Sequence, residues 1–261
     1  MPIITLTSDW KEYDFYVASL KGKILTDCPE VQIIDINHRI KPFNISQAAF
    51  VVRNSYPNFP DNTVHIIAVH AEPENGGMLL GARKDKHFFL CSDNGILGLL
   101  GGSAPQEVVN ISGNLKEEPG SFIALSVFAT TACRLSGGTP LTALGSPVKN
   151  FNSQTPLRAT IEDLTITGSV IYIDSYQNAI TNISQELFSR VGKGRPFKIY
   201  VQSKHYMIDR INKRYNETEP GDLLAIFNSS GLLEIAIGSG NAAGLLKLTT
   251  NSTIRVEFNE G

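Results

Sequence analysis

The chain has 261 residues, 42% of them apolar and 18% charged, which is the composition of a globular protein and not of a disordered one. Its length is enough for one large domain or two ordinary ones, each with a buried core. A formal net charge of −2 gives no basic footprint for nucleic acid, and no apolar run reaches the roughly 18 residues of a membrane helix. We therefore expect neither nucleic acid nor a membrane among its partners.

Apolar strands alternate with helices in the first half of the chain. This pattern predicts an α/β domain over residues 1–150, with a mostly parallel sheet covered by helices on both faces. The expected strands are residues 3–7, 31–36, 64–69, 79–83 and 87–91, and the expected helices are residues 13–23, 46–54 and 121–135.

The pattern changes near residue 150. A polar, turn-rich stretch predicts a linker at residues 151–160. Short strands separated by turn residues then predict an all-β domain over residues 161–261, either a small barrel or a sandwich. The expected strands are residues 165–173, 196–201, 223–227, 233–237 and 253–257, with a short helix at residues 183–191.

The three cysteines, Cys28, Cys91 and Cys133, are an odd number at wide spacing, which suits neither a disulfide framework nor a zinc site. All three lie in apolar contexts, so we expect buried free thiols. Residues 1–5 lack the features of a signal peptide, and a reduced, cytoplasmic protein follows as the default. The five histidines show no metal-ligand spacing, so we expect no metal.

Polar residues follow the first two predicted strands, at the sheet edge where α/β proteins bind ligands. Asp9 could accept both hydroxyls of a ribose, and Asp14 lies five residues further on. Either carboxylate could instead cap the next helix. Phe43 could form the wall of a site for an aromatic base or a thioether, or it could be a core aromatic beneath a loop.

His70 and Glu72 follow the third predicted strand, close to Glu74. A histidine has an unperturbed pKa of about 6.5, which suits a base near neutral pH. The alternative is a solvated loop with a hydrogen-bonded histidine. In the second half, the Ser/Gly-rich loops 228–231 and 238–243 could hold an adenine edge or a carboxylate, or they could be ordinary hairpin turns.

The most informative stretch is 173–183, which crowds Asp174, Asn178 and further polar residues behind an apolar run. Such a cluster either closes a turn or holds a polar ligand. Its pattern resembles the Asp-x-(Phe/Tyr)-Gly-Asn-x-x-Thr-Asn-Ile signature of the S-adenosylmethionine (SAM) hydroxide adenosyltransferase family, which includes the fluorinase and chlorinase. Other motifs follow in the family's order, namely Ser8-Asp9 with Tyr16-Val17, Leu20-Lys21-Gly22, Asp35-Ile36-Asn37-His38, Asp93-Asn94-Gly95-Ile96-Leu97 and Asn228-Ser229-Ser230-Gly231.

The resemblance implies an α/β domain joined to a C-terminal β-barrel. It also implies a homotrimer, with each SAM site between one subunit's first domain and a neighbour's second domain. SAM would be substrate or ligand, with no cofactor. The implied ligand-binding residues are Asp9 at the ribose, Asp14, Asp174 and Ser229 at the methionine amine and carboxylate, Phe43 packing on the ligand, Asn178 at adenine, and the backbone of Ser239 at the base edge.

The departures from the family pattern concern catalysis. Family hydrolases position a water or hydroxide with an Asp-Arg-His set, and these positions correspond here to His70, Gly77 and Ile123. The halogenase pattern is not restored, because its Tyr and Ser equivalents are His70 and Ala124. The Gly of the signature is Gln177. His70 with Glu72 is the hypothesis for a replacement that orients a water.

Three functions remain open at this point. The first is cleavage of SAM by water to give adenosine and methionine. The second is a non-catalytic trimer that binds SAM or adenosine. The third is a structural trimer whose pocket has closed, with Ile123 helping to fill it.

Overall fold

The computed structural model describes residues 1–73, 77–114 and 121–259. Glu74 lies outside this part of the chain. The structure divides into two compact units, Met1–Pro156 and Leu157–Gly261. Their boundary falls inside the stretch for which we predicted a linker, but the start of that stretch packs on the first unit. The N–H of Asn152 donates to Asp93 Oδ1 (2.7 Å), and Phe151 packs against the apolar core.

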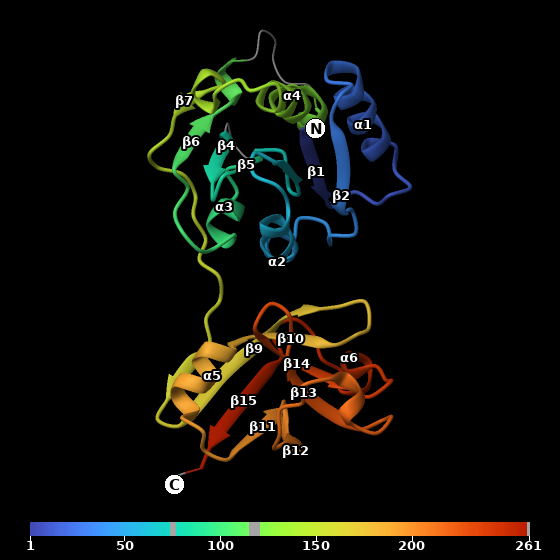
Figure 1. Ribbon diagram of the computed structural model, residues 1–261, viewed down its shortest axis with the longest axis vertical. Coiled ribbons are helices and arrows are strands. Elements are labelled where there is room, and N and C mark those ends of the chain that lie inside the picture. Colours follow the sequence, from blue (N-terminus) through green and yellow to red (C-terminus); the bar gives the residue numbers. More distant parts are fainter. Residues whose placement is uncertain (74–76, 115–120, 260–261) are drawn as a thin grey trace. The chain divides into compact units, whose positions relative to one another are not determined.

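The first unit is built on one mixed sheet with the order β2-β1-β3-β5-β4-β6-β7 (Figure 1). Strands β2, β1, β3 and β5 run parallel, and the remaining pairs are antiparallel. The predicted α/β class and its five strands are confirmed. The strands are β1 (Ile3–Ser8), β2 (Gln32–Asn37), β3 (Val64–Ala68), β4 (Leu79–Lys84), β5 (His87–Ser92), β6 (Glu107–Asn110) and β7 (Ser146–Pro147).

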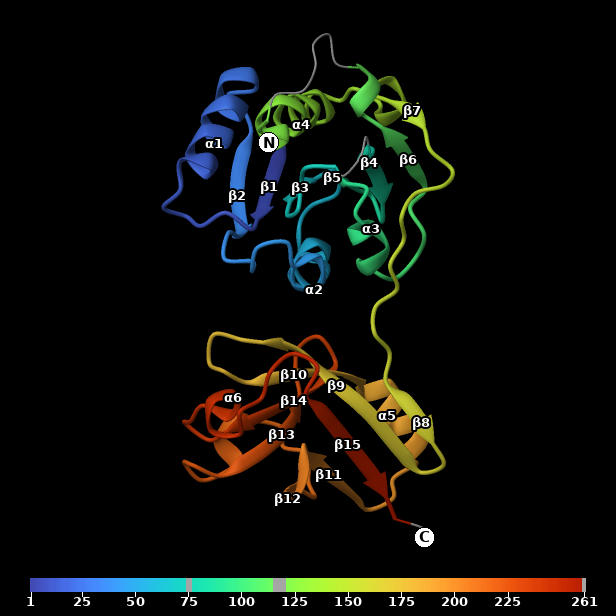
Figure 2. The ribbon, with the colours of Figure 1, turned by 180° about the vertical axis from the view of Figure 1, so that it is seen from behind.

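Helices cover both faces of this sheet, as Figures 1 and 2 show from opposite sides. Helices α1 and α4 pack on one face, around Leu20, Ile24 and Phe128, and helices α2 and α3 pack on the other, around Val52 and Leu97. The helical segments are α1 (Phe15–Asp27), α2 (Ile45–Ser55), α3 (Ile96–Leu99), the π-helix Ala124–Phe128, α4 (Ala129–Ser136), and the 3₁₀ turns Tyr56–Asn58, Ser112–Asn114 and Leu141–Ala143.

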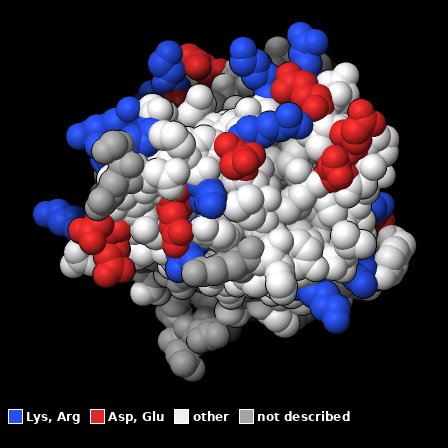
Figure 3. Space-filling model, turned by 90° about the horizontal axis from the view of Figure 1, so that it is seen from below, with Lys and Arg blue, Asp and Glu red and all other residues white. Residues whose placement is uncertain are grey.

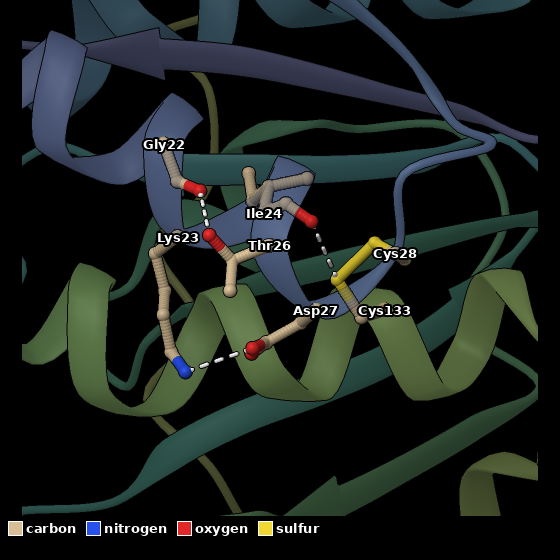
Figure 4. The surroundings of a disulfide bond; sticks show 7 residues. All are labelled: Gly22, Lys23, Ile24, Thr26, Asp27, Cys28 and Cys133. Atoms are coloured by element: carbon tan, nitrogen blue, oxygen red, sulfur yellow. Dashed lines mark hydrogen bonds and ion pairs between the residues drawn. A yellow bond between two sulfur atoms is a disulfide. The ribbon is translucent and has the colours of Figure 1, made fainter.

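A disulfide joins α1 to α4 (Figure 4). Cys28, at the C-terminal end of α1, is bonded to Cys133 in α4, with 5.6 Å between the Cα atoms. The prediction of free thiols is therefore wrong for these two residues, and so is the expectation of a fully reduced protein. They are 105 residues apart, and only the packing of α1 on α4 brings them together. Cys91 is a free, buried thiol, and burial, with a smaller contribution from Asp93, raises its pKa to about 12.

The second unit is a nearly closed antiparallel sheet with the order β12-β11-β15-β9-β10-β14-β13, and β8 pairs with β9. Its inward side chains, Ile166, Leu233 and Ile235 among them, form one core, which confirms the barrel class. The elements are β8 (Thr160–Glu162), β9 (Thr165–Ile173), β10 (Ala179–Ser184), α5 (Gln185–Gly192), β11 (Phe197–Val201), β12 (Ser203–Ile208), the 3₁₀ turn Tyr215–Glu217, β13 (Leu223–Phe227), β14 (Leu232–Ile237), α6 (Ala242–Leu245) and β15 (Thr253–Phe258).

The surface carries both charge signs. On the face seen in Figure 3, Lys and Arg side chains lie next to Asp and Glu side chains. Within the described ranges, no helix combines the length and the apolar character needed to cross a membrane.

Two buried histidines, His65 in β3 and His87 at the start of β5, lie next to each other in the parallel part of the sheet. Thr5 Oγ1 lies 2.7 Å from His65 Nδ1, and His65 Nε2 lies 3.2 Å from His87 Nδ1. Burial, together with the neighbouring His87, lowers the pKa of His65 to about 3. Burial also lowers the pKa of His87, against the opposing effect of Asp61 and Asp85. The His65 imidazole is therefore neutral in the folded protein at neutral pH.

This pair makes stability depend on pH. An unfolded His65 binds a proton below about pH 6.5, whereas the folded one does not, so acid favours unfolding. We expect the free energy of unfolding to fall by roughly 1–2 kcal/mol between about pH 6.5 and pH 5, above the range where carboxylates titrate. Urea unfolding at each pH measures it. His65→Gln should flatten this slope and His205→Gln, at an exposed histidine, should not. An unchanged slope in His65→Gln would contradict the assignment.

The disulfide gives a second expectation. A bond that closes a loop of this length restricts the unfolded chain, and its removal costs roughly 2–5 kcal/mol. We expect a reductant to lower the free energy of unfolding of the native protein, measured by urea unfolding, by that amount and to leave a Cys28→Ser/Cys133→Ser variant unaffected. Thiol labelling of the unfolded, unreduced chain should modify Cys91 alone.

Candidate functional site

The carboxylate of Asp9 connects three strand ends of the first unit. Asp9 follows β1, Phe43 lies in the loop after β2, and His70 follows β3. Asp9 Oδ2 accepts the backbone N–H of Phe43 (2.9 Å) and that of His70 (3.2 Å). No protein partner of the second oxygen, Oδ1, is recorded among the described residues. One oxygen thus holds the backbone, and the other is left for a hydroxyl or amine donor.

Both residues that Asp9 holds have left-handed backbone conformations. Phe43 has φ 64° and His70 has φ 48°, which residues with a Cβ rarely adopt and which costs of order 1–3 kcal/mol each. Such strain persists only where surrounding contacts enforce it, and it clusters at functional sites. Here the hydrogen bonds to the Asp9 carboxylate help to hold both left-handed conformations.

The Phe43 side chain is 68% exposed, so the interpretation as a core aromatic is wrong. Its ring meets that of His70 edge to face, with 5.4 Å between the centroids. Asn94, which the sequence placed in a family motif without a role at the site, donates to the carbonyls of Val69 (3.2 Å) and His70 (3.0 Å) and fixes the end of this strand. The Asp93-Asn94-Gly95 turn after β5, the neighbour of β3 in the sheet, was the available signal.

The other two predicted residues of the first unit are less firmly held. Asp14 occupies the N-cap position of α1, but its side chain makes no capping bond and accepts only a long contact from Lys11 N (3.4 Å). Asp14 therefore stands at the capping position, but its side chain does not form the capping hydrogen bond. Glu72 is exposed, and its proposed partnership with His70 stays a prediction.

An aromatic cluster lies next to Asp9. Trp10 contacts Tyr16 and Phe122, with centroid distances of 5.8 and 5.0 Å, and Tyr16 contacts Phe122 at 5.1 Å. Phe122 precedes the π-helix Ala124–Phe128, and such local π-helices occur often at functional sites. Ile123 and Ala124 are both buried, so the segment presents apolar packing where the family motif carries polar catalytic groups.

In the second unit, Asp174 and Asn178 close the β9–β10 turn. Asp174 Oδ1 accepts the N–H of Asn178 (2.8 Å), and Asp174 N–H donates to the Asn178 carbonyl (3.1 Å). The turn needs a left-handed residue at Gln177 (φ 66°), which explains the Gly of the family signature. Ala243 N–H donates to the Gln177 carbonyl (2.9 Å), so loop 238–243, with Ser239 also left-handed (φ 51°), lies against this turn.

Asn228 shapes the loop that carries Ser229. Its Oδ1 accepts the N–H groups of Ser230 (3.0 Å) and Leu232 (3.2 Å), and its Nδ2 donates to Glu234 Oε2 (3.1 Å). Ser229 itself is exposed at the tip. The loop is a hairpin turn whose exposed serine remains available for a ligand, so the two interpretations of this loop are compatible.

No group of three or more His, Cys, Asp or Glu residues that could hold a metal occurs in the part of the chain that the structure describes.

Each unit contributes a separate polar set. The first unit brings Asp9, Phe43 and His70 into contact, and the second brings Asp174 and Asn178 together.

Family models cover most of the sequence. Residues 4–145 match the SAM hydroxide adenosyltransferase N-terminal domain, and residues 168–255 match the SAM hydroxide adenosyltransferase C-terminal domain. The chain belongs to the SAM hydroxide adenosyltransferase family. The residues from Asp9 to His70 lie in its N-terminal domain, and those from Asp174 to Ser239 lie in its C-terminal domain.

Individual relatives of this chain match over nearly their whole length. The (R)-S-adenosyl-L-methionine hydrolase of Methanocaldococcus jannaschii is 27% identical, covering 99% of this chain and 97% of that protein. The (R)-S-adenosyl-L-methionine hydrolase of Salinispora arenicola is 26% identical, covering 98% and 97%. A crystal structure of an uncharacterized conserved protein from Thermotoga maritima has the same fold, with a TM-score of 0.88 at 24% identity, covering 98% and 99%.

The Asp9 contacts predict a large difference between two neighbouring carboxylates. Asp9→Ala removes the acceptor of two backbone N–H groups, and relaxation of the two strained residues offsets only part of this, so we expect a loss of about 2–4 kcal/mol in the free energy of unfolding. Asp14→Ala removes one long contact and should cost less than about 1 kcal/mol. Urea unfolding of both variants tests this. Equal losses would show that Asp9 does not hold the strand ends.

Proposed function

We propose that this chain binds SAM and catalyses attack of water or hydroxide on C5′, releasing adenosine and methionine. The observation that carries the proposal is the Asp9 arrangement, a fixed carboxylate with one oxygen left over beside an exposed aromatic ring. Such a carboxylate suits the two hydroxyls of a ribose. Relatives named (R)-S-adenosyl-L-methionine hydrolase, aligned over nearly the full chain, support the same substrate and reaction.

The reaction needs little acid catalysis at the leaving group. The oxygen of water bonds to C5′, the C5′–S bond breaks, and its electron pair stays on sulfur, so methionine leaves as a neutral thioether. The remaining task is to position and desolvate the nucleophile and to take up one proton. We assign that task to His70, oriented through Glu72, because its half-buried ring borders Phe43 at the strand end.

The binding roles follow the two polar sets. Asp9 Oδ1 takes the ribose hydroxyls, and Phe43 packs on the nucleoside. Asp14, Asp174 and Ser229 take the amine and carboxylate of the methionine part. Asn178 bonds adenine, and the backbone at Ser239, already left-handed, approaches the base edge.

Neither set includes all of these contacts, so we propose a homotrimer in which the first unit of one subunit faces the second unit of its neighbour. We further propose a cytoplasmic protein that needs no cofactor beyond SAM itself. Light scattering should give three times the 28.5 kDa chain mass, and a monomer would contradict the shared site.

The reaction is tested by incubating the protein with SAM and separating the products by chromatography. We expect adenosine and methionine in equal amounts. His70→Ala should lower the rate by roughly 100-fold or more, as loss of a general base does, without changing SAM affinity in calorimetry. The control is His205→Ala, at an exposed histidine of the second unit.

Two other outcomes of these experiments would identify the alternative functions. Binding of SAM without products would identify a non-catalytic trimer. Binding of neither SAM nor adenosine at millimolar concentration would identify a structural protein and contradict both ligand-based functions.

A further inference from the structure

Glu234 is a buried carboxylate on the outer face of the barrel. Along β14 the neighbours Leu233 and Ile235 enter the barrel core, so Glu234 points to the other face of the sheet. It is nevertheless only 2% exposed, because Tyr215 and Asn228 bind it there. A buried glutamate outside the main core needs a reason beyond packing.

Both oxygens of Glu234 accept hydrogen bonds from neutral groups. Tyr215 Oη donates to Oε1 (2.8 Å), and Asn228 Nδ2 donates to Oε2 (3.1 Å). The orientation of the Asn228 amide is fixed, since its oxygen already accepts two backbone N–H groups. Neither partner carries a positive charge, so these hydrogen bonds occupy the oxygens without neutralising a carboxylate charge.

A second carboxylate belongs to the turn that leads into the neighbouring strand. Strand β10 pairs with β14, with Ile180 opposite Glu234, and Asp174 bonds Asn178 directly before β10. Burial, the bond to Glu234 and the nearby charge of Asp174 together raise the pKa of Tyr215. Within the described ranges, the Asp174 carboxylate bonds Asn178 alone. Among the residues that the structure describes, no ion pair includes Asp174 or Glu234. Buried charge normally has a counterion, and no described residue of this chain forms an ion pair with Glu234.

We propose that Glu234 is a specificity-determining residue. Its charge lies beside Asp174 and the loop that carries Ser229, no described cation neutralises it, and it selects a cationic ligand over a neutral nucleoside. This inference rests on the proposed function. SAM carries a sulfonium and an ammonium group, whereas adenosine is uncharged. The ligand itself supplies the missing counterion, and the fixed carboxylate discriminates the charged substrate from the released nucleoside.

The test is the Glu234→Gln variant, studied by calorimetry with SAM and with adenosine. Glutamine has the same shape, and its oxygen and amide can bond Asn228 and the Tyr215 hydroxyl. We expect the Kd for SAM to rise roughly tenfold or more, as for a charge interaction over several ångströms at a protein surface, and the Kd for adenosine to change less than about twofold. Unchanged adenosine binding also shows that the variant is folded.

Two control variants separate charge from structure. Glu162→Gln, on the exposed strand β8, should leave both Kd values unchanged. Tyr215→Phe removes one bond to Glu234 but keeps its charge, so the ratio of the two Kd values should stay at the wild-type value.

The failure of this inference differs from the failure of the proposed function. If Glu234→Gln weakens both ligands equally, or neither, Glu234 is a structural residue and the inference is overturned while SAM binding stands. If the wild-type protein does not bind SAM at all, the proposed function fails and the inference fails with it.

Discussion

The candidate site depends on one oxygen atom, Asp9 Oδ2, which accepts N–H groups from two different loops. Without this acceptor, the left-handed conformations of Phe43 and His70 have less to offset their cost. The exposed ring of Phe43, the placement of His70 and the free second oxygen of Asp9 all follow from that one bonding arrangement. The parallel strands bring the loops near each other, and the carboxylate fixes their relative positions.

The two units use acidic residues in a similar way. In the first, Asp9 organises loops through backbone N–H groups, and in the second, Asp174 and Glu234 do so through Asn178 and Asn228. In each case the loop is shaped by neutral donors, so the negative charge is not consumed by a lysine or arginine. Such carboxylates suit a ligand that carries positive charge, as the proposed ligand SAM does.

The sequence predicted the elements whose apolar pattern is strong, such as β3 and β9, and it missed those whose residues are mixed. Strand β10 was missed because Thr181 and Asn182 resemble a polar loop, although Thr181 is buried and bonds the Leu233 carbonyl. The site residues were found as positions at strand ends. The Asp9 bonds and the Cys28–Cys133 pairing could not be found, since both depend on which distant segments pack together.

The link between α1 and α4 also changes the covalent topology of the first unit. Residues 28–133 form a closed ring that contains β2, β3, β5 and the His70 loop, whereas β1 with Asp9 lies outside it. A single cut of the backbone inside the ring would leave one covalent molecule. Asp9, whose oxygen holds the strand ends, therefore lies outside the ring. Only noncovalent contacts join this oxygen to Phe43 and His70 inside the ring.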